Sequence, residues 1–280
     1  METTELDNKE VKLITKGYEF LRQLCSFNAD ITSFRGNLNP ISNRVAYIMH
    51  QLDTHNIKYV VDKFQPIVGV PDAEDGKFAE VNIVVEIEGV NKDITTIFSA
   101  HHDVNNPESE NCQDNTASVA NLLDLCVRLS KNKPANNVVI CFNDSEEKVS
   151  PNTCGIQRLI QNINGGKYGQ VKYVVVLELT ANGRNYWMSY DNENLLSQTI
   201  RNIHPTTHRV RTPYNDSFVV ERTGIPSVCI GSLDNDNINY AKARKFCYTW
   251  SMCHSIADTF DSQANEGDMD LFVNYLESLI

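Results

Sequence analysis

Three apolar runs in the middle of the chain lead into acidic or histidine side chains. DITTIFSA directly precedes His101, NNVVICF is soon followed by Glu146 and Glu147, and YVVVLEL carries Glu178 near its end. Runs of this kind, separated by segments with helical spacing, are typical of parallel strands that are covered on both faces. In such folds ligands bind beyond the carboxyl ends of the strands. The sequence therefore predicts an α/β protein with a site at one edge of its sheet.

Segments with helical spacing alternate with the strands. One helix is indicated by an apolar face made of Val119, Leu122, Leu123, Cys126 and Leu129. Further helices are predicted within the first thirty residues, at 42–55, 155–163 and 195–203, after Asp216 and at the carboxyl terminus. Additional strands are predicted in KYVVDKF, AEVNIVVEIEG and PSVCIG. This alternation predicts a single domain over residues 1–280, a three-layer sandwich in which helices cover both faces of a mostly parallel sheet.

The charge and hydropathy of the chain restrict its partners. Its formal net charge is -11, which opposes the phosphate backbone of nucleic acid. No stretch approaches the roughly 20 apolar residues that a membrane-spanning helix needs. The segment METTELDNKEVKLITKGYEF has no positively charged region followed by an apolar core, unlike a secretory signal. We therefore expect a cytoplasmic protein that binds neither nucleic acid nor membranes.

Eight cysteines are scattered along the chain, without CxxC pairs. Most are expected to be buried apolar residues, because this usage is not that of a disulfide scaffold. Cys247 and Cys253 are an exception, since they lie close together beside a candidate metal ligand. A disulfide between them is an alternative to two free thiols.

The candidate site residues are ambiguous when each is taken alone. His101 and Asp103 form a His-x-Asp pair that is common by chance, and adjacent acids such as Glu146 and Glu147 often belong to a solvated surface. Asp114 directly precedes a predicted helix and could cap its first turn. Their gathering at strand ends is not expected by chance, however, and imidazole and carboxylate groups are the ligands that zinc prefers together with thiolates. The pattern therefore indicates a metal site.

The order of these motifs, from Thr95 to the carboxyl terminus, resembles the co-catalytic zinc exopeptidases, which include bacterial leucyl aminopeptidase and glutamate carboxypeptidase II. SAHHDV resembles the family's His-x-Asp strand end, CQDNTASVANLL its Asp-Asn helix start, and SEE its paired glutamates. VVLELTANG resembles the strand with a further acidic ligand. YNDSF followed by GIPSV resembles the Ser-Asp and Gly-Ile-Pro segments, and CHSIADTF the closing His-x-x-x-Asp-Thr.

The resemblance implies a zinc-exopeptidase-like fold with two Zn²⁺ ions held by five residues. It places Asp114 between the two ions. His101 and Glu178 would complete one ion's ligands, and Glu147 and His254 would complete the other's. Most family members have aspartate at the position of Glu178.

The resemblance also assigns roles to neighbouring residues. Glu146 would be the general base that accepts a proton from an activated water. Asp103 and Asp258 would each orient a ligand histidine, and Asp103 is counted with Glu146 as catalytic. His102 is interpreted as a packing residue, and Asp216 either caps a helix or contacts a substrate amine.

The activity implied by the resemblance is that of an aminopeptidase acting on peptides or on small aminoacyl or acyl amides. A carboxypeptidase, a dipeptidase or an N-acyl deacylase would use the same site. An inserted lid of about 50 residues is not expected, because the stretch between Glu178 and His254 is already filled by predicted helices and strands. Glutaminyl cyclase, a relative with one zinc ion, is a further alternative, although His101 and Glu147 favour two ions. A non-catalytic binding protein is disfavoured because all five predicted ligands are present.

Overall fold

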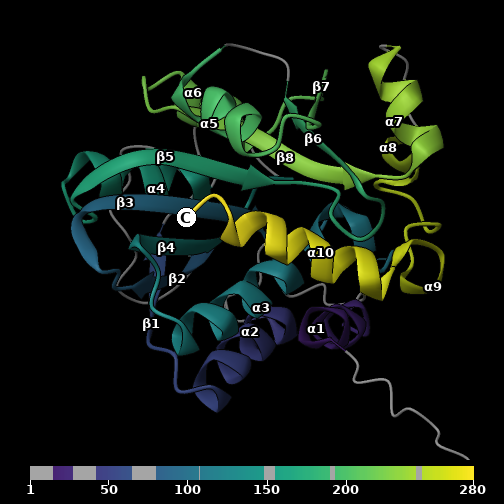
Figure 1. Cartoon of the computed structure of the whole chain (residues 1–280). Coiled ribbons are helices and arrows are strands. Elements are labelled where there is room, and N and C mark those ends of the chain that lie inside the picture. The colour runs from purple at the N-terminus through teal and green to yellow at the C-terminus, as the bar shows by residue number, and fades with distance from the viewer. Residues whose placement is uncertain are drawn as a thin grey trace, which may run out of the picture.

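The computed structural model describes residues 15–27, 42–64, 80–106, 108–147, 155–189, 193–243 and 248–280, and a mixed eight-stranded sheet runs through them (Figure 1). Its strands are β1 (Tyr59–Phe64), β2 (Glu80–Ile87), β3 (Asn91–His101), β4 (Asn136–Asn143), β5 (Gln170–Leu177), β6 (Asn185–Ser189), β7 (His208–Val210) and β8 (Ser227–Leu233). The strand order is β1-β2-β4-β3-β5-β8-β6-β7.

The four central strands, β4, β3, β5 and β8, are parallel, whereas three pairings nearer the edges are antiparallel: β1 with β2, β2 with β4, and β6 with β8. The prediction of a mostly parallel sheet is therefore wrong in its outer part. The reason is visible at β2 and β3, which are joined by the three residues 88–90. So short a connection reverses the chain, whereas β3 and β4 are joined by a helix that allows a parallel crossover.

Helices cover both faces of the sheet, as predicted for a three-layer sandwich. They are α1 (Lys16–Cys25), α2 (Asn43–Thr54), α3 (Ala117–Lys131), α4 (Gly155–Asn164), α5 (Leu195–Ile203), α6 (Asp216–Glu221), α7 (Asn235–Lys242), α8 (Tyr248–Met252), α9 (Phe260–Gln263) and α10 (Glu266–Glu277). Residues of α1, α2, α3 and α10 pack in one hydrophobic core, and residues of α4, α6 and α7 pack in another. Figure 1 shows the first set of helices gathered on one side of the central strands.

The predicted helices at 42–55, 155–163 and 195–203 correspond to α2, α4 and α5. Helix α2 begins after Ser42, whose hydroxyl accepts the backbone N–H of Val45 at 3.1 Å and so caps the first turn. The predicted amino-terminal helix is α1, and the part of that prediction before residue 15 lies outside the described residues. Within the described ranges, no helix combines the length and apolar character that crossing a bilayer requires.

Candidate metal centre

Three neighbouring strands bring candidate ligands to one edge of the sheet. His101 is the last residue of β3, Glu178 directly follows β5, and Glu146 and Glu147 lie shortly after β4. These residues meet because β3 lies between β4 and β5, and because the carboxyl ends of parallel strands share one edge. The predicted location of the site at the strand ends therefore agrees with the structure.

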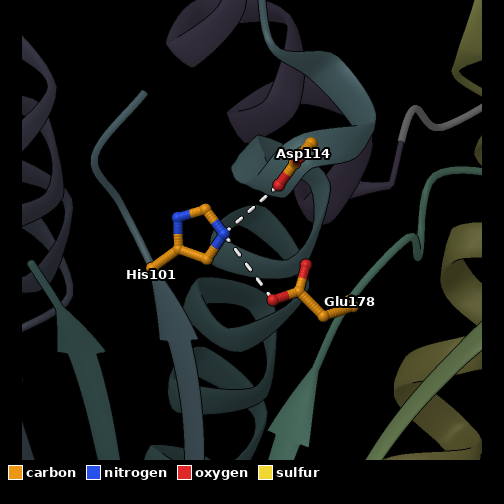
Figure 2. Close-up of side chains that lie close together, drawn as sticks. All are labelled: His101, Asp114 and Glu178. Carbon is orange, nitrogen blue, oxygen red and sulfur yellow. Dashed lines mark ion pairs between the residues drawn. The ribbon is translucent and has the colours of Figure 1, made fainter. Parts of the chain in front are cut away.

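A first group of ligands surrounds His101, which is only 2 % exposed. Its Nε2 lies 3.2 Å from Oδ1 of Asp114 and 3.6 Å from Oε1 of Glu178 (Figure 2). On the opposite side of the ring, Nδ1 lies 3.3 Å from Oδ1 of Asp103. The ring thus presents one nitrogen to the two carboxylates and the other nitrogen to Asp103, which is the orientation expected of a supported metal ligand.

A second group of ligands surrounds His254, in the loop after α8. Its Nε2 lies 3.1 Å from Oδ2 of Asp114 and 3.0 Å from Oε1 of Glu147. Asp114 itself lies in the short segment η2 (Cys112–Thr116), just before α3. Each oxygen of Asp114 therefore faces a different histidine, so this carboxylate lies between the two groups.

Both groups have the donor atoms of a zinc site. In the group of His101, Asp114 and Glu178, and in that of Asp114, Glu147 and His254, one ligand atom per residue lies within 4.8 Å of the others. The same limit is met by His101, Glu146 and Glu147. Imidazole nitrogen with carboxylate oxygen is a donor set that suits Zn²⁺. The structure thus brings together all five predicted ligands, with Asp114 shared as the resemblance implied.

The electrostatics of the centre also fit cations. Burial raises the pKa of Glu146 and of Glu178 well above the usual range, and nearby acids, including Asp114, raise both further while His101 opposes the shift. Burial alone would lower the pKa of His101, but Glu178 and other carboxylates raise it well above its ordinary value. Buried carboxylates therefore repel one another here, and bound cations would relieve that repulsion.

Asp103 supports two parts of the centre at once. It is fully buried, and its two oxygens accept the backbone N–H groups of Glu146 at 3.2 Å and Glu147 at 3.1 Å. Because it also lies beside His101, one carboxylate fixes the end of β3 relative to the turn after β4. The predicted role of Asp103 in orienting His101 stays a prediction.

Asp258 differs from its predicted role of orienting a histidine. Its carboxylate accepts the backbone N–H of Gln113 at 2.8 Å and of Asp114 at 3.2 Å. Burial, opposed by these hydrogen bonds and reinforced by the charge of Asp114, raises the pKa of Asp258 to about 7. Asp258 therefore holds the backbone that carries Asp114, a contact between distant segments that sequence spacing does not reveal.

Arg44 is a further supporting residue that sequence patterns do not mark. It is 1 % exposed and lies on α2. Its guanidinium donates to the carbonyl oxygen of His102 at 3.2 Å and to Oγ1 of Thr116 at 2.6 Å. These partners adjoin the segments of His101 and Asp114. His102 itself is buried, in agreement with its predicted packing role, and its Nε2 lies 2.9 Å from the carbonyl oxygen of Val81.

Three residues at the centre have left-handed backbone conformations. Ser145, just before Glu146, has φ 62°, Leu179, just after Glu178, has φ 55°, and His254 has φ 65°. Such conformations cost about 1 to 3 kcal/mol each in residues other than glycine and persist only where surrounding contacts enforce them. The turns that present these ligands are therefore strained by the packing around them.

The centre opens into a cavity of about 580 Å³, whose other walls are partly aromatic. Trp187 and Trp250 line it with their ring centroids 5.8 Å apart in an edge-to-face arrangement. Tyr214 also lines the cavity and stacks on Phe218 at 5.4 Å. Sequence reasoning missed these residues. The chain contains only two tryptophans, and both lie at this cavity. Their rarity is visible in the sequence, but their location is not.

Asp216 is buried and accepts a hydrogen bond from Nδ2 of Asn143 at 2.5 Å. The cap of α6 is the side chain of Asn215, so the capping interpretation of Asp216 is wrong. Cys253 lines the cavity and has a free thiol. Cys247 lies outside the described residues, and the free thiol of Cys253 contradicts the alternative of a disulfide between the two.

Comparison with known proteins identifies the class to which this centre belongs. The family model of peptidase family M28 matches residues 82–275, which is more than half of the chain. The chain therefore belongs to peptidase family M28, and it is a metal-dependent hydrolytic peptidase by family. A comparison with curated protein sequences gives no match.

Solved structures share the fold at low sequence identity. Glutaminyl cyclase from Bacteroides thetaiotaomicron, bound to N-acetylhistamine, is 15% identical with a TM-score of 0.68, over 95% of this chain and 96% of that chain. A leucine aminopeptidase precursor from the same organism is 14% identical with a TM-score of 0.66, over 95% of each chain. The zinc aminopeptidase BSAP from Bacillus subtilis is 12% identical with a TM-score of 0.59, over 72% of this chain and 50% of that chain. At these identities the likeness shows a shared fold, and one of the three solved structures is a zinc aminopeptidase.

Proposed function

We propose that this protein is an aminopeptidase that uses two zinc ions. The observation that carries the proposal is the position of Asp114, whose Oδ1 lies 3.2 Å from His101 and whose Oδ2 lies 3.1 Å from His254. One ion would be held by His101, Asp114 and Glu178. The other would be held by Asp114, Glu147 and His254.

The chemistry requires a base beside the ions. When bound, a pair of zinc ions lowers the pKa of a water molecule and polarises an amide carbonyl. Glu146 lines the cavity, and its backbone N–H donates to Asp103, which supports a role for its carboxylate as the base that would accept the proton of that water. The hydroxyl joins the carbonyl carbon, the C–N bond breaks, and Glu146 returns the proton to the departing amine.

The charge of the cavity supports an amino-terminal substrate over a carboxy-terminal one. The described lining includes the carboxylates of Asp114, Glu146, Glu147 and Glu178, and no lysine or arginine is among these lining residues. A substrate carboxylate would need a cationic side chain, which none of these lining residues supplies, so a carboxy-terminal substrate is disfavoured. The aromatic wall next to the acids offers a surface for an apolar side chain.

The test combines metal analysis with a substrate panel. The zinc-loaded protein should contain two equivalents of zinc and should cleave aminoacyl amides with a free amino group, but not the same amides after N-acetylation. Peptides that offer only a free carboxylate should react slowly. Faster cleavage of the N-acetylated or carboxy-terminal substrates would refute the aminopeptidase assignment.

Glutaminyl cyclase is the second candidate, because a solved cyclase matches nearly the whole length of this chain. A cyclase would release ammonia from a peptide with amino-terminal glutamine and leave the peptide bond intact. The expected zinc content would then be one equivalent. Mass spectrometry of a glutamine-leading peptide separates the two candidates, since hydrolysis yields free glutamine and cyclisation leaves a peptide 17 mass units lighter, roughly the mass of one ammonia.

A further inference from the structure

Two consecutive asparagines in the segment between β3 and η2 contact both terminal ligands of the same group. Nδ2 of Asn105 donates to Oε2 of Glu147 at 3.0 Å. Nδ2 of Asn106 donates to the backbone carbonyl oxygen of His254 at 3.3 Å. The segment after β3 therefore reaches the turn after β4 and the loop after α8.

The contact of Asn105 engages one oxygen of Glu147, so the other oxygen is the one that would bind a cation. While Oε2 accepts the amide of Asn105, Oε1 faces His254 at 3.0 Å. A carboxylate fixed in this way presents a single defined oxygen. Hydrogen bonds that orient a ligand typically change metal affinity by about 10- to 100-fold.

The contact of Asn106 acts on the most exposed ligand. The side chain of His254 is 49% exposed, compared with 1% for that of His101 and 13% for that of Glu178. Packing therefore fixes His254 less than it fixes the ligands of the other group, so hydrogen bonds from neighbouring side chains have more influence on its position.

We propose that Asn105 and Asn106 are positioning residues for the cation held by Asp114, Glu147 and His254, and that they leave the ion at His101 and Glu178 unaffected. The inference rests on the proposed function only in its assumption that the centre binds zinc. It gives the two ions different supports. Burial and the Asp103 carboxylate beside its ring support His101 at one ion. The asparagine pair contacts the ligands of the other ion, where Asp103 also holds the backbone of Glu147.

The test is a zinc titration of the full chain against a chromophoric chelator. Asn105→Ala and Asn106→Ala should each weaken one of the two zinc affinities by about 10- to 100-fold and leave the other within about twofold. Asn105→Leu keeps the approximate size of the side chain and removes the donor, so it should match Asn105→Ala. Asn185→Ala is the matched control, because Nδ2 of Asn185 donates to the carbonyl oxygen of Leu233 at 3.0 Å, away from the centre. Its zinc affinities should equal those of the parent.

Three results would overturn the inference: unchanged zinc affinities in both alanine variants, equal weakening of both sites, or parent-like binding by Asn105→Leu. If the parent binds a single ion, that ion must still weaken in Asn105→Ala, and an unchanged affinity again overturns the inference. The proposed function fails in a different way. A parent that binds two zinc ions but cleaves no aminoacyl amide refutes the aminopeptidase and leaves the positioning role in place.

Discussion

After the metal is removed, the free energy of unfolding of this protein should fall as the pH rises from 5 to 8. In the metal-free chain, burial raises the pKa of Glu146 and Glu178, so the folded state keeps protons that the unfolded state has released. A group whose pKa is higher in the folded state than in the unfolded state stabilises the fold fully at a pH below its unfolded-state pKa. This stabilisation is lost as the pH rises to its folded-state pKa. His254 acts in the same direction above its unfolded pKa of about 6.5, because hydrogen bonds from its ring to Asp114 and Glu147 raise its pKa to about 10.

The size of this effect follows from the number of protons retained. Each proton that the folded chain holds and the unfolded chain does not lowers the free energy of unfolding by about 1.4 kcal/mol per pH unit. While both buried glutamates stay protonated, they alone contribute a slope of about 3 kcal/mol per pH unit. His101 and Asp258, whose pKa values are also raised, add to it in the same direction. The side chain of His254 is half exposed, so solvent screening makes its contribution smaller. A change of 1 kcal/mol moves Tm by about 2 to 4 °C in chains of this size, so a fall of several degrees per pH unit is expected.

Zinc should reverse the sign of this dependence. Ligands must lose their protons to bind the ion, so zinc affinity, and the stability that it adds, increases with pH. Thermal unfolding at pH 5, 6, 7 and 8, at constant ionic strength, should give a Tm that falls with pH after chelation and does not fall with zinc bound. Glu178→Gln removes one titrating group and should make the slope of the chelated protein shallower by about 1.4 kcal/mol per pH unit. A chelated protein whose Tm is flat or rises over this range would refute the reasoning.

Substitutions within the centre should have distinguishable effects on turnover and on zinc binding. Glu146→Gln should lower kcat by about 10² to 10⁴, a barrier increase of about 3 to 5 kcal/mol, with zinc content unchanged; restoration by added zinc would contradict its role as base. Glu147→Gln should weaken one ion, and excess zinc should partly restore turnover in steady-state assays. Asp114→Asn should weaken both ions, and two tightly bound equivalents by metal analysis would exclude the bridging position. Glu178→Ala should release one ion selectively, whereas Glu178→Asp should keep part of the activity; an unaltered zinc titration of the alanine variant would remove Glu178 from the centre.

The sequence predicted the parts of the centre that depend on local pattern. An apolar run identifies a covered strand, and the residue after it must lie at the sheet edge, which is why His101 and Glu178 were placed correctly. The outer strands were less predictable. β7 has only three residues, and the antiparallel direction of β2 follows from a short connection that hydropathy does not encode.

The supporting residues Arg44 and Asn105, which sequence reasoning missed, act through contacts between distant segments. Arg44 precedes its partner Thr116 by 72 positions, and Asn105 precedes Glu147 by 42. Neither belongs to a periodic pattern or a recognisable motif, because the packing of α2 and the course of a loop bring these partners together. Arg44 also lies outside residues 82–275, the segment that the peptidase family model matches.

The two groups of ligands depend on different levels of the structure. His101 and Glu178 adjoin strands that pair directly with each other, so the sheet itself sets their separation. His254 belongs to a loop, and its connection to the sheet runs through Asp258, four residues later, which binds the backbone of Asp114. The sheet therefore sets the positions of His101 and Glu178, whereas the position of Asp114, which both groups share, also depends on the contact between its segment and that of Asp258. Since Asp114 belongs to both groups, that contact also determines how far apart two ions would lie.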